Sequence, residues 1–214
     1  MKRQGIWNFY AKFYNKLFTQ KYSLRPTRLI ILDWLNSFII NTDRTYRILD
    51  CGCGTGQLIF EIKERFLDFN LEITGIDLSQ NMIEMAEEQN KYSGIRFING
   101  NVVTFNSLEE YDIIVSTHAM PYFPDMDAAI KKCFGLLKGG GLFCMAQAAS
   151  NNNYDKTILA LLELVSSEAM YPSTSKIQEL IEKAGFKDIY LKYVKETRLL
   201  PTIFALRCGK AEEI

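Results

Sequence analysis

The sequence predicts an α/β fold with a doubly wound parallel sheet, and two observations support this prediction. Runs of β-branched and aromatic residues alternate with helix-length segments along most of the chain. The first of these runs is followed by three glycines at every second position, which is typical of a tight turn between elements. Because strands and helices alternate, we expect parallel strands with helices covering both faces of the sheet.

The predicted strands follow one another at regular intervals. Five lie before residue 150, at 46–50, 71–77, 95–100, 111–117 and 141–148, and two final candidates lie at 186–196 and 202–209. With 214 residues and 48% hydrophobic content, the chain is expected to form one domain with a substantial core.

The helices are predicted from apolar spacing and from capping residues. Ser79 is the expected N-cap of the helix that follows the second strand. Ser175 and Gln178 have capping-box spacing ahead of a helix that is expected to end at Gly185. Two further pieces, residues 1–40 and 149–175, interrupt the alternation, and each is expected to hold at least one helix.

Composition argues against several classes of function. Lys plus Arg and Asp plus Glu number 25 each, so no large electrostatic attraction to nucleic acid or anionic lipid is expected. The apolar stretch at 29–40 contains Asp33 and Asn36 and is far shorter than the roughly 20 apolar residues of a membrane span. The start of the chain lacks the apolar core of a secretory signal, so we expect a cytoplasmic protein.

The segment ILDCGCGTGQ, at 48–57, carries the main functional signal. Its glycines, Gly52, Gly54 and Gly56, fit neither the dinucleotide fingerprint nor a Walker loop. Asp50 ends the strand beside them and would repel a bound pyrophosphate. Asp77 ends the next strand, where an acidic residue can accept hydrogen bonds from both ribose hydroxyls of a nucleoside. The pair of carboxylates therefore favours a nucleoside that bears a positive charge instead of phosphates.

Five segments resemble the successive signatures of class I S-adenosylmethionine-dependent methyltransferases: ILDCGCGTG, ITGIDLSQNMIEMA, YDIIVSTHAMPYFPD, LLKGGGLF and IQELIEKAGF. They are similar in style to the small-molecule branch that includes the ubiquinone and menaquinone C-methyltransferases. The resemblance implies a Rossmann-like, seven-stranded, mostly parallel sheet with an antiparallel last strand. It also implies S-adenosylmethionine as cofactor, S-adenosylhomocysteine as product, a small-molecule acceptor and in-line methyl transfer.

The sequence character of the end pieces, which differs from that of the core, divides the chain into four parts. Residues 1–40 would form an N-terminal helical lid, 45–148 the cofactor-binding core, 149–175 a helical cap segment, and 176–210 the last helix and strands. The lid and the cap segment are expected to decide the acceptor. A monomer or a homodimer is expected.

The resemblance also assigns roles to residues of the cofactor site. The glycines would approach the methionine portion, Asp50 would hold its ammonium group, and Asp77 would bind the ribose hydroxyls. Asn101 stands where the family usually has an aspartate, and its amide oxygen can still accept from the adenine amino group. Leu78 and Met82 would pack against the adenine. The remaining cofactor-binding residues implied are Cys53, Val102 and Thr117.

Simpler interpretations stay open for these motifs. The glycines could form only a tight turn, and Asp77 could cap the following helix. No second cysteine pair or histidine cluster accompanies Cys51 and Cys53, so no metal site is expected, and the five cysteines are expected to be reduced core thiols. Gly139 replaces the usual proline of the turn into the fifth strand.

His118 is the single histidine and follows the fourth predicted strand, at the edge where ligands bind in such sheets. It could accept a proton from the acceptor, or it could merely pack near the cofactor. Tyr122 is a second catalytic candidate. Three tyrosines of the N-terminal segment either pack in the core or line the acceptor pocket as part of the lid: Tyr10, Tyr14 and Tyr22.

Two other functions are weighed beside a small-molecule methyltransferase. One is a sensor or accessory subunit that binds the cofactor without turnover. The other is an RNA or protein methyltransferase, which the zero net charge and the lack of an Asn-Pro-Pro-Tyr type tetrad after the fourth strand disfavour.

Overall fold

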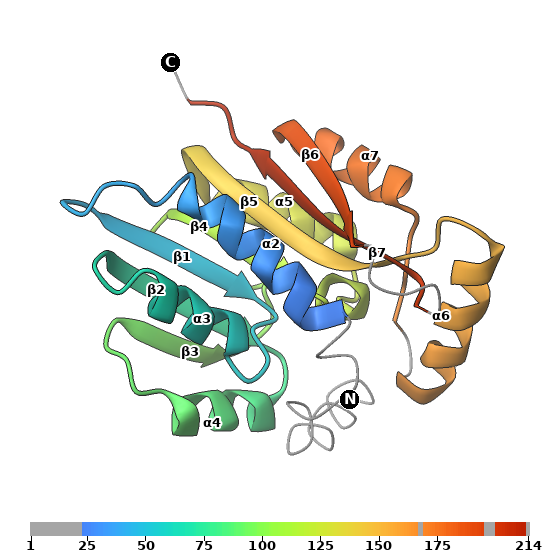
Figure 1. Ribbon diagram of the computed structural model, residues 1–214, viewed down its shortest axis with the longest axis horizontal. Helices are drawn as coiled ribbons and strands as arrows, with labels where there is room; N and C mark the ends of the chain where they lie inside the picture. Colours follow the sequence, from blue (N-terminus) through green and yellow to red (C-terminus); the bar gives the residue numbers. More distant parts are fainter. Residues whose placement is uncertain (1–22, 167–168, 195–199, 213–214) are drawn as a thin grey trace.

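The computed structural model describes residues 23–166, 169–194 and 200–212, and its centre is one twisted sheet (Figure 1). The sheet order is β3-β2-β1-β4-β5-β7-β6. The first five strands pair in parallel, and β7 runs antiparallel to both β5 and β6. The strands are β1 (Thr45–Cys51), β2 (Asn70–Asp77), β3 (Ile95–Asn99), β4 (Tyr111–Thr117), β5 (Leu137–Ala149), β6 (Lys187–Val194) and β7 (Thr202–Gly209). The predicted fold class is confirmed.

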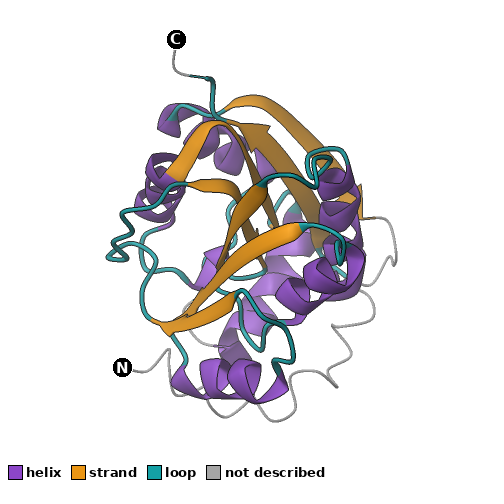
Figure 2. Ribbon diagram, turned by 90° about the vertical axis from the view of Figure 1, so that its left-hand side faces the viewer, coloured by secondary structure: helices purple, strands orange, loops and turns teal. Residues whose placement is uncertain are grey.

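Helices cover both faces of this sheet (Figure 2). They are α2 (Arg25–Asn36), α3 (Gln57–Arg65), α4 (Gln80–Gln89), α5 (Met126–Leu136), α6 (Asn153–Ser166) and α7 (Thr174–Ala184), with a short 3-10 helix η2 (Met120–Tyr122). The helices α2 and α3 share one apolar core with the sheet, and α5 and α7 share the other. Successive side chains of a strand point to opposite faces, so Ile48 lies in one core and Leu49 in the other.

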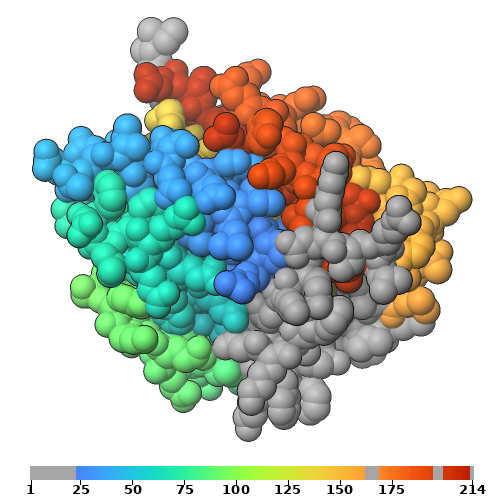
Figure 3. Space-filling view, in the orientation of Figure 1, coloured from blue at the N-terminus to red at the C-terminus, as the bar shows by residue number. Residues whose placement is uncertain are grey.

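The apolar stretch at 29–40 belongs largely to α2, whose inner face buries Ile31, Leu32 and Leu35. In the space-filling view α2 lies between the surfaces of α3 and β6 (Figure 3), and the rings of Trp34 and Tyr190 meet edge to face at 6.0 Å. Among the described residues, no helix combines the length and apolar content that a membrane crossing needs.

Two capping predictions are confirmed and one is wrong. Ser79 caps α4 by accepting a hydrogen bond from the backbone N–H of Met82, and Gly185 ends α7 with φ of 104°. The N-cap of α7 is Ser173, which accepts from the N–H of Lys176, and not Ser175. The helix begins at Thr174, so Ser175 already lies in its first turn, where its side chain cannot replace the cap.

The fifth strand also begins earlier than predicted. It starts at Leu137 and not at 141, because Leu137 already pairs with Tyr111 before an irregularity shifts the register. Gly139, expected in the turn ahead of this strand, therefore lies inside it.

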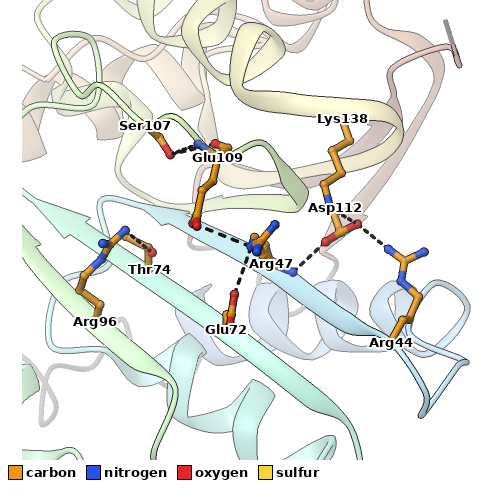
Figure 4. Close-up of polar contacts among 9 residues, drawn as sticks. All are labelled: Arg44, Arg47, Glu72, Thr74, Arg96, Ser107, Glu109, Asp112 and Lys138. Carbon is orange, nitrogen blue, oxygen red and sulfur yellow. Dashed lines mark hydrogen bonds and ion pairs between the residues drawn. The ribbon is translucent and has the colours of Figure 1, made fainter.

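At the amino ends of the parallel strands, a buried carboxylate accepts hydrogen bonds from three donors (Figure 4). Asp112 accepts hydrogen bonds from the Arg44 guanidinium, from Lys138 Nζ at 2.9 Å and from the backbone N–H of Arg47 at 2.8 Å. Its side chain is only 4% exposed. This cluster ties β1, β4 and β5 together at the edge opposite the carboxyl ends of the strands.

Asp112→Ala is expected to lower the free energy of unfolding by about 2–3 kcal/mol, because the Arg47 N–H loses its acceptor while the partly exposed cations regain water. Urea denaturation measures this loss. Glu72→Ala is the control, since it removes an ion pair of Arg47 that is largely exposed (Figure 4), and it should have a much smaller effect. Equal losses of stability in the two variants would contradict the stabilising role given to the buried carboxylate of Asp112.

Candidate functional site

A cleft opens at the carboxyl ends of β1, β2 and β4. Nine residues predicted for the site line it: Gly52, Gly54, Asp77, Leu78, Met82, Val102, Thr117, His118 and Tyr122. Five further lining residues were not predicted: Ile76, Ser79, Gly100, Ala119 and Phe123. All five are sequence neighbours of predicted residues, so the strand-end rule could have found them.

The glycine loop is held against the end of β2. The N–H groups of Gly52 and Cys53 both donate to the carbonyl of Ile76, at 2.8 and 3.1 Å. Gly52 has φ of 80°, a left-handed conformation that favours glycine. A Cβ on Gly52 would lie 2.1 Å from the Cβ of Ala119. The loop therefore needs glycine here for its backbone conformation and for its close packing against the segment after β4.

Asp77 lines the cleft and contacts this loop directly. Its Oδ2 accepts from the N–H of Gly54 and its Oδ1 from the N–H of Ser79, each at 2.9 Å. Burial raises the pKa of Asp77, while these two hydrogen bonds oppose the rise. Helix α4 is capped by Ser79, so Asp77 is not its N-cap. Each carboxylate oxygen can accept more than one hydrogen bond, which leaves capacity for a ligand in the cleft.

Asp50 lies beneath the loop and is 1% exposed. Its Oδ1 has no hydrogen-bond partner among the described residues. Burial raises the pKa of Asp50 to about 8, the charge of Asp77 adds to the rise, and Arg28 opposes it. Asp50 does not line the cleft itself, but it places a second acidic group beside it. A cation bound here would favour the ionised form of Asp50, so this region favours a cationic group over a phosphate.

Asp50 is expected to make stability fall with pH. Its pKa is about 8 in the folded protein and about 4 in the unfolded chain, so only the folded state keeps the proton between these values, and unfolding becomes easier as pH rises through them. Asp50→Asn removes this titration. The free energy of unfolding, measured by urea denaturation between about pH 4 and about pH 8, should therefore rise with pH in the variant relative to the wild type. Parallel pH profiles of the wild type and Asp50→Asn would refute the raised pKa of Asp50.

His118 directly follows the last residue of β4, lines the cleft and is half-buried. Its backbone has φ of 54°, and its N–H donates to the carbonyl of Ala146. Its Nε2 lies 3.1 Å from the hydroxyl of Thr27, on α2. Burial and the nearby charge of Arg28 lower the pKa of His118 to about 4. The ring is therefore neutral near physiological pH.

Three other predicted residues do not line the cleft. Cys53 and Gly56 lie in the loop below it, and the Oδ1 of Asn101 accepts from the N–H of Val103 at 2.9 Å. Tyr122 lines the cleft, and its hydroxyl lies 3.0 Å from that of Tyr171. The lid candidates Tyr10, Tyr14 and Tyr22 lie outside the described residues.

The cysteines are all buried and free, and the Sγ atoms of Cys51 and Cys133 lie 3.8 Å apart. Within the described ranges, no group of three or more His, Cys, Asp or Glu side chains is placed to hold a metal ion.

Known proteins share this fold. A chain in the complex of the Haloferax volcanii Trm112 methyltransferase activator with a methyltransferase superposes with a TM-score of 0.78 at 14% identity, covering 96% of this chain and 98% of that one. Magnesium protoporphyrin IX methyltransferase from Synechocystis, solved with S-adenosylhomocysteine bound, superposes with a TM-score of 0.70 at 16% identity, covering 91% and 88%. At these identities the superpositions show the fold alone.

The sequence comparisons go further. The chloroplastic 2-methyl-6-phytyl-1,4-hydroquinone methyltransferase 2 of rice is 28% identical over 152 residues, which are 71% of this chain and 42% of that protein. The matches with the first four curated relatives span 34–65% of those proteins' lengths. The model of the methyltransferase domain family matches residues 42–196, which include both carboxylates and the glycine loop. The chain belongs to the family of methyltransferase domains.

Proposed function

We propose that this protein transfers a methyl group from S-adenosylmethionine to a small-molecule acceptor. One observation carries the proposal: the half-buried Asp77 lines the cleft, the buried acidic group of Asp50 lies beside it, and no lysine or arginine is among its described lining residues. Such a site favours a cationic nucleoside over a phosphorylated one. Family membership and the bound S-adenosylhomocysteine of the Synechocystis structure support the proposal.

The roles proposed for the residues follow from their places in the cleft. Asp77 binds the ribose hydroxyls, and Leu78 and Met82 pack against the adenine. The glycine loop lets the backbone approach the methionine portion, and Asp50 beneath it favours the ammonium group. The other proposed contacts are those of Cys53, Gly56, Asn101, Val102 and Thr117.

When bound, S-adenosylmethionine supplies an electrophilic methyl group on a sulfonium. The protein's task is then to align an acceptor with that methyl group and to exclude water. The cleft has an apolar and aromatic wall formed by Ala119, Tyr122 and Phe123, of which only Tyr122 was predicted for the site. We therefore propose a small, partly hydrophobic acceptor, a class to which the hydroquinone substrate named for the rice relative also belongs.

Product formation tests this proposal. The purified protein is incubated with S-adenosylmethionine and with hydroquinones, phenols, thiols and amines, and S-adenosylhomocysteine is quantified against an acceptor-free control. We expect S-adenosylhomocysteine to form only when one of these acceptor classes is present. Tight cofactor binding without turnover in any class would favour the sensor or accessory role. Retention on RNA that weakens with salt would favour an RNA substrate, against which the zero net charge argues.

The cytoplasmic location, the monomeric or homodimeric state and the lid role of residues 1–40 stay predictions. Light scattering coupled to size exclusion measures the oligomeric state directly.

A further inference from the structure

A buried threonine on α2 meets the histidine of the cleft. Thr27 and His118 are 91 positions apart in the chain, yet Oγ1 of Thr27 lies 3.1 Å from Nε2 of His118. Thr27 is fully buried at 0% exposure. Its hydroxyl also lies 2.8 Å from the carbonyl of Leu24 and 3.0 Å from that of Ser23. The hydroxyl therefore has three polar neighbours.

Counting protons decides the direction of these hydrogen bonds. A hydroxyl has one proton to donate, whereas a carbonyl oxygen can only accept. Oγ1 lies only 2.8 Å from the carbonyl oxygen of Leu24, and two oxygens this close need a proton between them, which only the hydroxyl can supply. The proton of Thr27 therefore goes to a carbonyl, and Oγ1 is left to accept from the ring. Nε2 of His118 then carries the proton and donates it to Thr27. In a neutral imidazole the other nitrogen, Nδ1, is left as an acceptor.

We propose that Thr27 is a positioning residue that fixes His118 in the Nε2-protonated tautomer, so that Nδ1 accepts the proton of a methyl acceptor bound in the cleft. This inference rests on the proposed function and narrows it to acceptors that carry a proton on the attacking atom. An electron pair of the acceptor forms the bond to the methyl carbon. The carbon–sulfur bond breaks, and its electron pair stays on sulfur. The acceptor's proton passes to Nδ1 and then to water.

The electrostatics of the site fit this role. Arg28, next to Thr27 on α2, is the charged group that acts on the ring of His118, and it is paired with Glu61 of α3 at 2.9 Å. A neutral ring does not repel the sulfonium of the cofactor. A weak base is sufficient, because an oxygen that is gaining a methyl group becomes strongly acidic as the bond forms.

The single histidine makes the tautomer directly measurable. Protein labelled with 15N-histidine gives one imidazole spin system, whose nitrogen shifts and proton couplings identify the protonated nitrogen. We expect the Nε2-protonated tautomer in the wild type, a mixture of tautomers in Thr27→Val, and restoration in Thr27→Ser, which keeps the hydroxyl. Thr157→Val is the matched control, since Thr157 makes the same hydrogen bond to a carbonyl four residues earlier, at an exposed position of α6.

A kinetic arm separates this inference from the proposed function. With an acceptor that turns over, kcat should fall at least tenfold in Thr27→Val and recover in Thr27→Ser, with the affinity for S-adenosylmethionine unchanged. If no acceptor is methylated, the proposed function fails while the tautomer measurement still decides the role of Thr27. An Nδ1-protonated ring in the wild type overturns the inference even if Thr27→Val does not fold. A wild-type tautomer ratio and kcat in Thr27→Val also overturn it.

Discussion

Replacing Gly52 with alanine is expected to lower the free energy of unfolding by about 2–5 kcal/mol and to abolish cofactor binding. Two costs add. The added Cβ would lie 2.1 Å from the Cβ of Ala119, so the loop or the segment after β4 must move. The left-handed conformation of Gly52, at φ of 80°, is also strained for any residue with a Cβ. Chemical denaturation and a cofactor titration measure the two effects.

A second substitution separates the two costs. Ala119→Gly removes the atom that the new Cβ would strike, so the double variant Gly52→Ala with Ala119→Gly should regain most of the stability lost to the clash. The strain of the left-handed backbone should persist at about 1–2 kcal/mol. If the double variant is no more stable than Gly52→Ala alone, the packing between the loop and Ala119 is not the cause.

Asp77→Ala is expected to weaken the affinity for S-adenosylmethionine at least a hundredfold. Two hydrogen bonds from ribose hydroxyls to a carboxylate contribute about 1.5–3 kcal/mol each, and about 1.4 kcal/mol corresponds to a tenfold change. The variant also removes the acceptor for the N–H groups of Gly54 and Ser79, which loosens the loop. Calorimetric titration measures the affinity.

Two variants serve as comparisons for this result. Asp77→Asn keeps one carbonyl oxygen and the shape of the side chain, so its affinity should lie between those of the wild type and Asp77→Ala. Glu84→Ala removes a charge from the exposed side of α4 and should leave the affinity unchanged. Wild-type affinity in a folded Asp77→Ala would mean that the ribose is bound elsewhere.

The strands and the carboxyl edge of the sheet could be predicted because their signals are local. The strand β7 lies where its pattern predicts, at Thr202–Gly209, since it begins with the β-branched and aromatic residues Thr202, Ile203 and Phe204 and ends at a glycine. Asp77 and His118 were found because each ends or follows a parallel strand, and such ends meet at one edge.

Contacts between distant elements could not be predicted from the same signals. The meeting of Thr27 with His118 depends on how α2 crosses the sheet, and nothing in the local pattern at residue 27 indicates it. The packing of Ala119 against Gly52 likewise arises only when the segment after β4 folds over the loop. The start of α7 was misplaced because Ser173 and Ser175 are both suitable caps, and only the backbone of the preceding loop selects between them.

The most direct test of the central claim is a calorimetric titration of the wild-type protein with S-adenosylmethionine, with NAD as the comparison ligand. The acidic groups at the cleft, Asp77 in its lining and Asp50 beside it, predict saturable binding of S-adenosylmethionine. They predict no detectable binding of NAD, because the described lining offers no lysine or arginine to pair with its pyrophosphate. Binding of NAD, or no binding of S-adenosylmethionine by a protein shown to be folded, would contradict the assignment of this cleft to a cationic nucleoside.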